Sequence, residues 1–297
     1  MKEIVEIRSL KKIVGRKPIL KGIELKLSGG EILGLIGPNG AGKTTLLKII
    51  SGTVIATAGS VHFTEREAGI GILPESPALL PGLSGFRNLQ LLASLQNKIG
   101  KQEIREAMET VGLDPANRKA VGSYSLGMKQ RLMLAQAIME KPKLLLLDEP
   151  TNGLDPLGII DLRQLLYSLA DQGVGIIIAS HLLHEIELMC NRVAIINSGS
   201  IFREVDLRSN NGGQLIEISV SSPSDWDKLS HWAGKDNLQL LPSQGFPRGI
   251  LKSDIQASRV LAELLPAGIA VESIQPAATD LEAIFLECSQ MEDGVYR

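Results

Sequence analysis

Hydrophobic and polar residues follow two different periods along the first two thirds of the chain, and the change of period separates strands from helices. Residue-by-residue alternation over Ile4–Arg8 and Ile23–Leu27 predicts two half-buried antiparallel strands. Short continuous apolar runs at 32–36, 144–147 and 174–179 are typical of strands that are buried on both faces.

Apolar residues at helical spacing lie between these runs. They predict helical structure within 85–111, a helix that begins near Ser125, and helices over Pro156–Leu169 and His181–Cys190. Strands that alternate with helices in this way predict an α/β fold with a mainly parallel sheet.

The pattern changes after a polar, glycine-containing stretch at Ser209–Gly213, which we interpret as a linker. Beyond it the predicted order is strand, helix, two strands, helix, strand and a closing helix at Thr279–Cys288. The first six of these elements predict a small α+β domain of ferredoxin-like type. We therefore expect two domains, residues 1–208 and residues 212–297.

Composition and charge exclude several classes of function. A chain of 297 residues with 44% hydrophobic residues can form a core, and a net charge of −2 gives no general attraction to nucleic acid. Cys190 and Cys288 have neither metal nor redox spacing, so we expect a reduced, cytoplasmic location. The N-terminus lacks a signal-peptide pattern, and every apolar run is shorter than the roughly 18 residues of a membrane helix. We expect another chain to supply any membrane span.

The strongest chemical signal is the pattern Gly-x-x-x-x-Gly-Lys-Thr that begins at Gly37, between a buried strand and the start of a helix. Glycines let backbone N–H groups approach phosphate oxygens, Lys43 can reach the β- and γ-phosphates, and the Thr44 hydroxyl can ligate Mg²⁺. The sequence thus predicts a site for a nucleoside triphosphate with Mg²⁺. The predicted phosphate-binding residues are Pro38, Asn39, Gly40, Ala41, Gly42, Lys43, Thr44 and Thr45.

Two carboxylates follow the apolar run 144–147. Asp148 suits the ligand shell of Mg²⁺, and Glu149 suits a general base that polarises an attacking water. Three more segments occur in a set order: Ser125–Arg131 at a predicted helix start, Asn152–Pro156 after the acid pair, and Ser180-His181 after a strand. Alone, the first would be an ordinary helix cap.

Together these motifs resemble the nucleotide-binding subunit of ABC transporters, from residue 1 to about residue 205. The resemblance identifies Ser125–Arg131 as the signature segment, Leu154-Asp155 as the D-loop and His181 as the switch histidine that contacts the γ-phosphate. It implies a P-loop ATPase core with an antiparallel β subdomain and a short helical subdomain at about 76–140. The tail is similar to the accessory domain of drug- and peptide-antibiotic exporter ATPases.

The resemblance also implies partners. In the family, ATP lies between the phosphate loop of one subunit and the signature segment of another, so that Ser125, Gly127 and Asp155 would complete the site of a second copy. This implies a homodimer that drives separate transmembrane permease subunits from the cytoplasmic face of the membrane. We expect Glu75–Gln96 to contact the permease.

Three positions depart from the family pattern. Glu75 replaces the usual glutamine, and would still ligate Mg²⁺ while adding negative charge beside the triphosphate. ATPase subunits of bacitracin-resistance and lantibiotic-immunity exporters have a similar glutamate, so Glu75 resembles a feature of that subfamily. The alternative explanation is sequence drift at a position that tolerates substitution. Leu126 replaces the first glycine of the usual signature and Met128 its glutamine. Val14 stands where an aromatic ring usually stacks on adenine, which predicts weaker discrimination between bases.

The leading functional hypothesis is therefore an exporter ATPase whose cargo is a peptide antibiotic or a hydrophobic drug. Exporters of polysaccharides, lipids or ions share the same layout. A soluble ABC ATPase that acts on ribosomes or DNA is less favoured, because the chain holds one nucleotide domain. Lys43 and Asp148 are also only 105 positions apart, which leaves no room for a long coiled-coil insertion.

Overall fold

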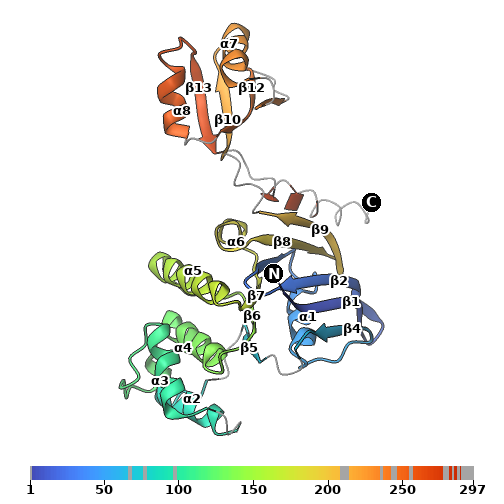
Figure 1. The fold of residues 1–297 in the computed structure, drawn as a ribbon, viewed down its shortest axis with the longest axis vertical. Helices are drawn as coiled ribbons and strands as arrows, with labels where there is room; N and C mark the ends of the chain where they lie inside the picture. The colour runs from blue at the N-terminus through green and yellow to red at the C-terminus, as the bar shows by residue number, and fades with distance from the viewer. Residues whose placement is uncertain are drawn as a thin grey trace. The chain divides into compact units, whose positions relative to one another are not determined.

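The computed structural model describes residues 2–65, 69–75, 79–95, 99–207, 214–234, 237–241, 246–253 and 257–276, with residues 281, 282, 284, 285 and 288. The chain divides into two compact units, Met1–Val205 and Asp206–Arg297, and Figure 1 labels most of their elements.

A six-stranded sheet forms the centre of the first unit, in the order β5-β6-β7-β3-β8-β9. Its strands are β3 (Ile32–Ile36), β5 (Ile70–Leu73), β6 (Leu144–Asp148), β7 (Gly175–Ala179), β8 (Arg192–Asn197) and β9 (Ser200–Asp206). The neighbours from β5 to β8 pair in parallel. Every residue of β3, β6 and β7 is buried, as continuous apolar runs predict.

Helices and a second sheet cover the two faces of this central sheet (Figure 1). On one face lie α5 (Pro156–Asp171) and α6 (Leu183–Met189). On the other lie α1 (Lys43–Ile50) and a three-stranded antiparallel sheet of order β2-β1-β4. A continuous hydrophobic core fills the space on this side, between β3, β6, β7, β8, α1 and the antiparallel sheet.

The antiparallel sheet extends further than the sequence pattern predicts. It consists of β1 (Glu3–Val14), β2 (Lys17–Ser28) and β4 (Ala58–Phe63). The register of β1 against β2 shifts between Ile7 and Leu10, where Ser9 has a φ of 44°. Such a bulge reverses the phase of the in–out alternation, so the alternating pattern ends at Arg8 although the strand continues.

Three helices form a separate layer beside α5 (Figure 1). They are α2 (Gly85–Ala93), α3 (Lys101–Thr110) and α4 (Leu126–Ile138), and the 3₁₀ turn η1 (Val121–Ser123) precedes α4. The helical pattern over 85–111 is thus two helices. Gly100 begins the second, because its backbone N–H donates to the Glu103 carboxylate at 2.9 Å. The helix predicted from His181 begins only at Leu183, so His181 lies in the preceding loop.

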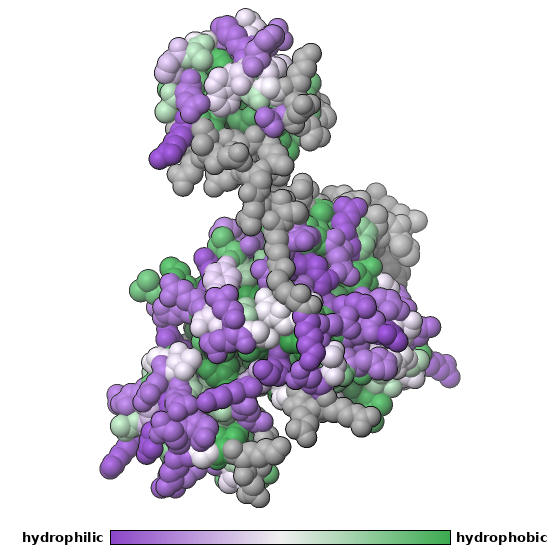
Figure 2. All heavy atoms as spheres, viewed as in Figure 1, coloured by the Kyte–Doolittle hydropathy of each residue, from purple (hydrophilic) through white to green (hydrophobic). Residues whose placement is uncertain are grey.

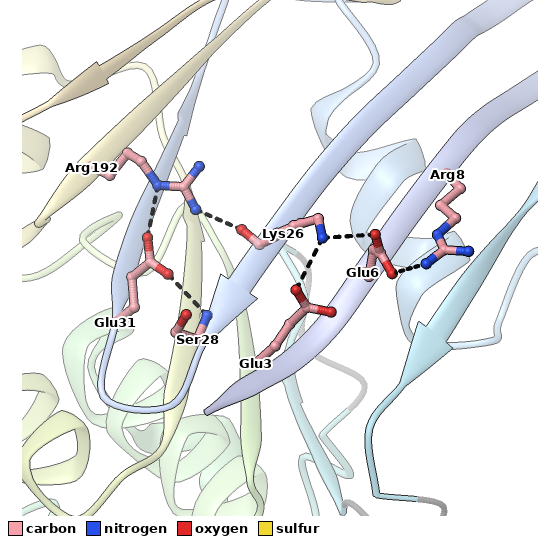
Figure 3. A network of polar contacts seen from close by, with 7 residues as sticks. All are labelled: Glu3, Glu6, Arg8, Lys26, Ser28, Glu31 and Arg192. Carbon is pink, nitrogen blue, oxygen red and sulfur yellow. Dashed lines mark hydrogen bonds and ion pairs between the residues drawn. The ribbon is translucent and has the colours of Figure 1, made fainter. Parts of the chain in front are cut away.

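Polar contacts join the antiparallel sheet to the central sheet (Figure 3). Arg192 of β8 donates from Nε to Glu31 Oε1 at 2.8 Å and also contacts Glu204 and the carbonyl of Lys26. Lys26 pairs with Glu3 and Glu6, and Arg8 also binds Glu6. Hydrogen bonds from these two cations lower the pKa of Glu6 to about 2.

The second unit contains a four-stranded antiparallel sheet of order β11-β12-β10-β13. Its elements are β10 (Gln214–Val220), α7 (Pro223–Ala233), β11 (Leu238–Leu241), β12 (Arg248–Ser253), α8 (Ala257–Leu264) and β13 (Val271–Pro276). Trp226 and Trp232 pack against its core, as expected for structural tryptophans. Residues 281, 282, 284, 285 and 288 are helical, and the rest of the predicted closing helix lies outside the described residues.

None of the helices in the described part of the chain is long and apolar enough to cross a membrane. The face drawn in Figure 2 shows hydrophobic residues scattered among hydrophilic ones.

Candidate functional site

The phosphate-loop pattern joins the end of β3 to the start of α1. Gly40 and Gly42 have φ values of 84° and 111°, which glycine adopts without steric cost. A Cβ atom at Gly42 would lie 2.7 Å from Leu20 Cδ2, and one at Gly37 would collide with the Ile196 carbonyl. The glycine pattern therefore reflects close packing of the loop against β2 and β8 as well as any approach to phosphate.

The turn between β8 and β9 supports the loop from a distant part of the sequence. The backbone N–H of Gly199 donates to the Ala41 carbonyl at 3.1 Å, and the Gly199 carbonyl accepts from Lys21 N–H at 2.8 Å. Two strands and a turn therefore hold the loop in shape, which is the rigidity that a binding loop requires.

Lys43 lies buried at the first position of α1. Its ammonium group donates to the carbonyls of Gly37 at 2.6 Å and Pro38 at 3.2 Å. Burial lowers the pKa of Lys43, while the charges of Glu149, Asp148 and Glu75 act in the opposite direction. The three predicted carboxylates therefore lie close enough to Lys43 for their charges to act on its ammonium group.

Asp148 lies buried at the end of β6, within reach of the Thr44 side chain. Burial raises the pKa of Asp148, its interaction with Thr44 opposes this, and the charges of Glu75 and Glu149 raise it further. The structure thus brings together Thr44 and Asp148, which the sequence predicts as metal ligands from separate motifs. Glu75 is exposed just beyond β5 and acts on both Asp148 and Lys43 through its charge.

The oxygen atoms of Thr44, Asp148 and Glu75 suit Mg²⁺ better than they suit a metal ion whose ligands all come from the protein. Among the described residues, no group of three or more His, Cys, Asp or Glu side chains is arranged to hold a metal ion. Mg²⁺ typically takes one or two carboxylates and completes its octahedron with water and substrate phosphates. Thr44 and Asp148, with Glu75 nearby, match that mode of binding.

Glu149 joins the loop after β6 to the end of β7 and the loop that follows it. Its backbone has a φ of 51°, and its N–H donates to the Ala179 carbonyl at 2.8 Å. Glu149 Oε1 lies 2.9 Å from His181 Nδ1, and Oε2 accepts from the buried Ser180 hydroxyl at 3.3 Å. Positive φ in a residue other than glycine costs about 1–3 kcal/mol, so the surrounding contacts must hold it in place.

The signature segment occupies the start of α4. Ser125 Oγ accepts from the N–H of Met128 at 3.2 Å, and a Cβ atom at Gly127 would lie 3.4 Å from the Gly153 carbonyl. Asp155 begins α5 in the same way, by accepting from Gly158 N–H at 2.9 Å. The two helix starts lie against each other within one chain.

Val14 lies at the tip of the β1–β2 hairpin with 58% of its surface exposed. Its neighbour Ile13 is also exposed and donates its N–H to Thr57 Oγ1 at 3.0 Å. Lys12 Nζ donates to the backbone carbonyl of Ile55 at 2.7 Å, and the Ile55 side chain is exposed. Ile13, Val14 and Ile55 give this tip an apolar but aliphatic surface.

Two residues lie inside predicted segments, but their contacts were not predicted from the sequence. Ser180 binds Glu149, and the buried Gln130 donates from Nε2 to the Pro150 carbonyl at 3.0 Å. Gln130 lies four positions before Leu134, on the same face of α4, and this spacing is a signal for burial. That its partner is the Pro150 carbonyl follows only from the tertiary structure.

A phosphate-binding loop after one parallel strand, with an Asp-Glu pair after another strand of the same sheet, defines a P-loop nucleoside triphosphatase. The family model described as ABC transporter matches residues 20–152.

Related proteins match more of the chain than the family model does. It is 39% identical to the uncharacterized ABC transporter ATP-binding protein YdbJ of Bacillus subtilis, over 98% of this chain and 97% of YdbJ. It is 39% identical to the lantibiotic transport ATP-binding protein SrtF of Streptococcus pyogenes, over 68% of this chain and 90% of SrtF. It is 39% identical to the bacitracin transport ATP-binding protein BcrA of Enterococcus faecalis, over 70% of each chain.

A solved structure of an ATP-binding subunit of an ABC transporter matches with a TM-score of 0.63 and 26% identity, covering 70% of this chain and 92% of the other. The chain therefore belongs to the ABC transporter family, as an ATP-binding subunit, and is an ATPase.

Proposed function

We propose that this chain hydrolyses ATP as a homodimer to drive a separate permease, with a peptide antibiotic or a hydrophobic drug as cargo. Its similarity to SrtF and BcrA, whose names refer to lantibiotic and bacitracin transport, supports this cargo class. The observation that carries the catalytic part is the position of Glu149, held by His181 and Ser180 and adjacent to the Asp148–Thr44 pair.

Each predicted site residue has a chemical role in this proposal. The loop from Pro38 to Thr45 binds the phosphates, with Lys43 as its cation, and Thr44, Asp148 and Glu75 hold the Mg²⁺ that accompanies ATP. Glu149 acts as general base toward the attacking water. His181 has about half of its side chain exposed and contacts Glu149, so it can turn toward a γ-phosphate.

The site is completed by a second copy. Ser125, Gly127 and Asp155 begin two helices that lie side by side, and helix starts favour anions. The sequence carries the phosphate loop once and the signature segment once, so a symmetric dimer would pair each loop with the partner's segment. In this arrangement the exposed aliphatic tip at Val14 would adjoin the base.

The permease contact is proposed at Glu75–Gln96. Leu80 is 47% exposed and Phe86 is partly exposed at the start of α2, which leaves apolar surface for a partner. Residues 76–78 and 96, which belong to this segment, lie outside the described residues. This contact would place the chain in the cytoplasm, on the inner face of the membrane.

The tail is proposed as a ferredoxin-like accessory domain over residues 212–297, following an ATPase domain over residues 1–208. Its antiparallel strand order, with the first and third strands central, supports that topology.

Glu149→Gln tests the catalytic part. This variant is expected to bind Mg²⁺-ATP, to elute as a dimer, and to lose about 100-fold or more in kcat, because a general base contributes that much. Lys43→Ala is the matched control and is expected to lose nucleotide binding and to remain monomeric. Normal turnover by Glu149→Gln would contradict the role of Glu149.

Cargo is tested in a susceptible bacterium that expresses the chain together with a candidate permease. Growth at raised concentrations of bacitracin, a lantibiotic or a hydrophobic drug, lost with Glu149→Gln, is the expected result. Unchanged sensitivity despite active ATP hydrolysis would assign the chain to another exporter class, for polysaccharides, lipids or ions.

A further inference from the structure

Leu126 makes a contact that the usual glycine of the signature segment cannot make. Its side chain lies over Gly153, in the loop that follows the acid pair. A Cβ atom at Gly153 would lie 3.2 Å from Leu126 Cβ and would collide with Leu126 Cγ and Cδ2. Leu126 and Gly153 are therefore matched in size: the leucine occupies the space that a side chain at 153 would need.

A hydrogen bond reinforces this contact one turn further along α4. Gln130 is buried and donates from Nε2 to the carbonyl of Pro150 at 3.0 Å. Between these two contacts, Gly127 lies against the Gly153 carbonyl and the Leu154 side chain. The first turns of α4 thus hold residues 150–154 at three points.

The same loop fixes the backbone of Glu149. Asn152 N–H donates to the Glu149 carbonyl at 3.2 Å, and Leu154 N–H donates to the Thr151 carbonyl at 3.1 Å. Because Glu149 has a positive φ, its orientation depends on what holds the residues after it.

We infer that Leu126 is a positioning residue that, together with Gln130, holds the loop carrying Glu149 against the signature segment of its own chain. This inference rests on the proposed function, in which Ser125 and Gly127 contact the nucleotide of the partner copy. In that dimer, displacement of the signature segment by one nucleotide would be passed through Leu126 and Gly153 to the general base of the other site.

The packing is tested first in the nucleotide-free protein by a thermal-unfolding cycle of Gly153→Ala, Leu126→Ala and the double variant. Gly173→Ala is the matched control, because Gly173 has a φ of 87° and open space around its Cβ position, whereas Gly153 has a φ of 78°. Gly173→Ala reports backbone strain alone. Gly153→Ala is expected to lower Tm by at least about 2 °C more than the control, and Leu126→Ala is expected to remove that excess.

The positioning role is tested in the same variants by kcat, by KM for ATP and by the Kd for Mg²⁺-ATP. Gly153→Ala is expected to lower kcat by about 10- to 100-fold with little change in Kd, because small displacements of a catalytic group cost that much. The double variant should recover most of the lost kcat. Recovery distinguishes displacement by Leu126 from a direct effect of the added methyl group at residue 153.

Two results would overturn the inference: a kcat of Gly153→Ala no lower than that of Gly173→Ala, or a loss of kcat that persists in the double variant. Absence of ATP hydrolysis in the unmodified chain would instead overturn the proposed function, and the positioning role with it. The thermal cycle does not depend on activity, so it separates a wrong packing contact from a wrong function.

Discussion

At the scale of single residues, the candidate site places several carboxylates close together. Asp148 is buried near two further carboxylates, and its pKa is raised above the usual range by that burial. A carboxyl group whose pKa is raised on folding destabilises the folded state above that pKa, so Asp148 is retained at a cost in stability. Binding of Mg²⁺ by this side chain would relieve that cost, which is typical of a residue kept for function.

The base site gives a prediction at the same scale. Because the tip around Val14 is aliphatic, GTP and CTP should compete with ATP, and Val14→Tyr should raise the preference for ATP by roughly 2- to 10-fold. Competition of the three nucleotides in a dimer-forming background such as Glu149→Gln measures this preference. Lys17→Tyr, on the other side of the same turn, is the control. Strict selection of ATP by the unmodified chain would contradict the prediction.

At the scale of elements, the starts of α4 and α5 determine how the motifs meet. Ser125 and Asp155 each accept a backbone N–H as helix caps, which fixes where each helix begins. Arg131 then joins α3, α4 and α5, because it donates to the Val111 carbonyl at 3.1 Å and to Asp161 at 3.0 Å. The helical layer and the ATPase core are therefore connected close to the signature segment.

Gln130→Leu tests this connection. Loss of the amide leaves the buried Pro150 carbonyl without its partner, which should lower the free energy of unfolding by about 1–3 kcal/mol and lower kcat. Gln136→Leu makes the same change on the same helix at a partly exposed position and should alter neither. Urea unfolding and steady-state ATPase assays measure the two effects. Equal behaviour of the two variants would remove Gln130 from the connection.

At the scale of the whole molecule, each of the two units has buried hydrophobic residues of its own. The first unit has a core between the central sheet, α1 and the antiparallel sheet, and the second has one between the tail sheet, α7 and α8. A unit with its own core can unfold cooperatively without the other. The residues proposed to bind the nucleotide all belong to the first unit.

Calorimetry of the full chain should therefore show two unfolding transitions. In the Glu149→Gln background, Mg²⁺-ATP at about 100 times its Kd should stabilise only the larger transition, by about 2.7 kcal/mol. Lys43→Ala should show no such shift. A single transition that moves as a whole with nucleotide would show that the two units unfold together.

The local sequence was enough to determine the class of this protein, because the residues that define the class lie in short contiguous motifs. Gly37–Thr45 and Asp148-Glu149 each combine a required residue order with a flanking apolar run, and both parts can be recognised without knowing the fold. Continuous apolar runs likewise predicted the strands that are fully buried. The pattern failed where a bulge at Ser9 reversed the alternation of β1.

Tertiary structure alone decided how the motifs touch. Glu149 meets His181, 32 positions away, because β6 and β7 are neighbours in the sheet and end at the same edge. Gln130 meets Pro150, and Leu126 meets Gly153, because α4 packs its first turns against the loop after β6. Such contacts depend on distances between segments that are remote along the chain, and no local periodicity encodes them. The motifs and the comparisons identify the chain as an ABC ATPase, and the packing between the motifs determines how the Glu149 side chain is held.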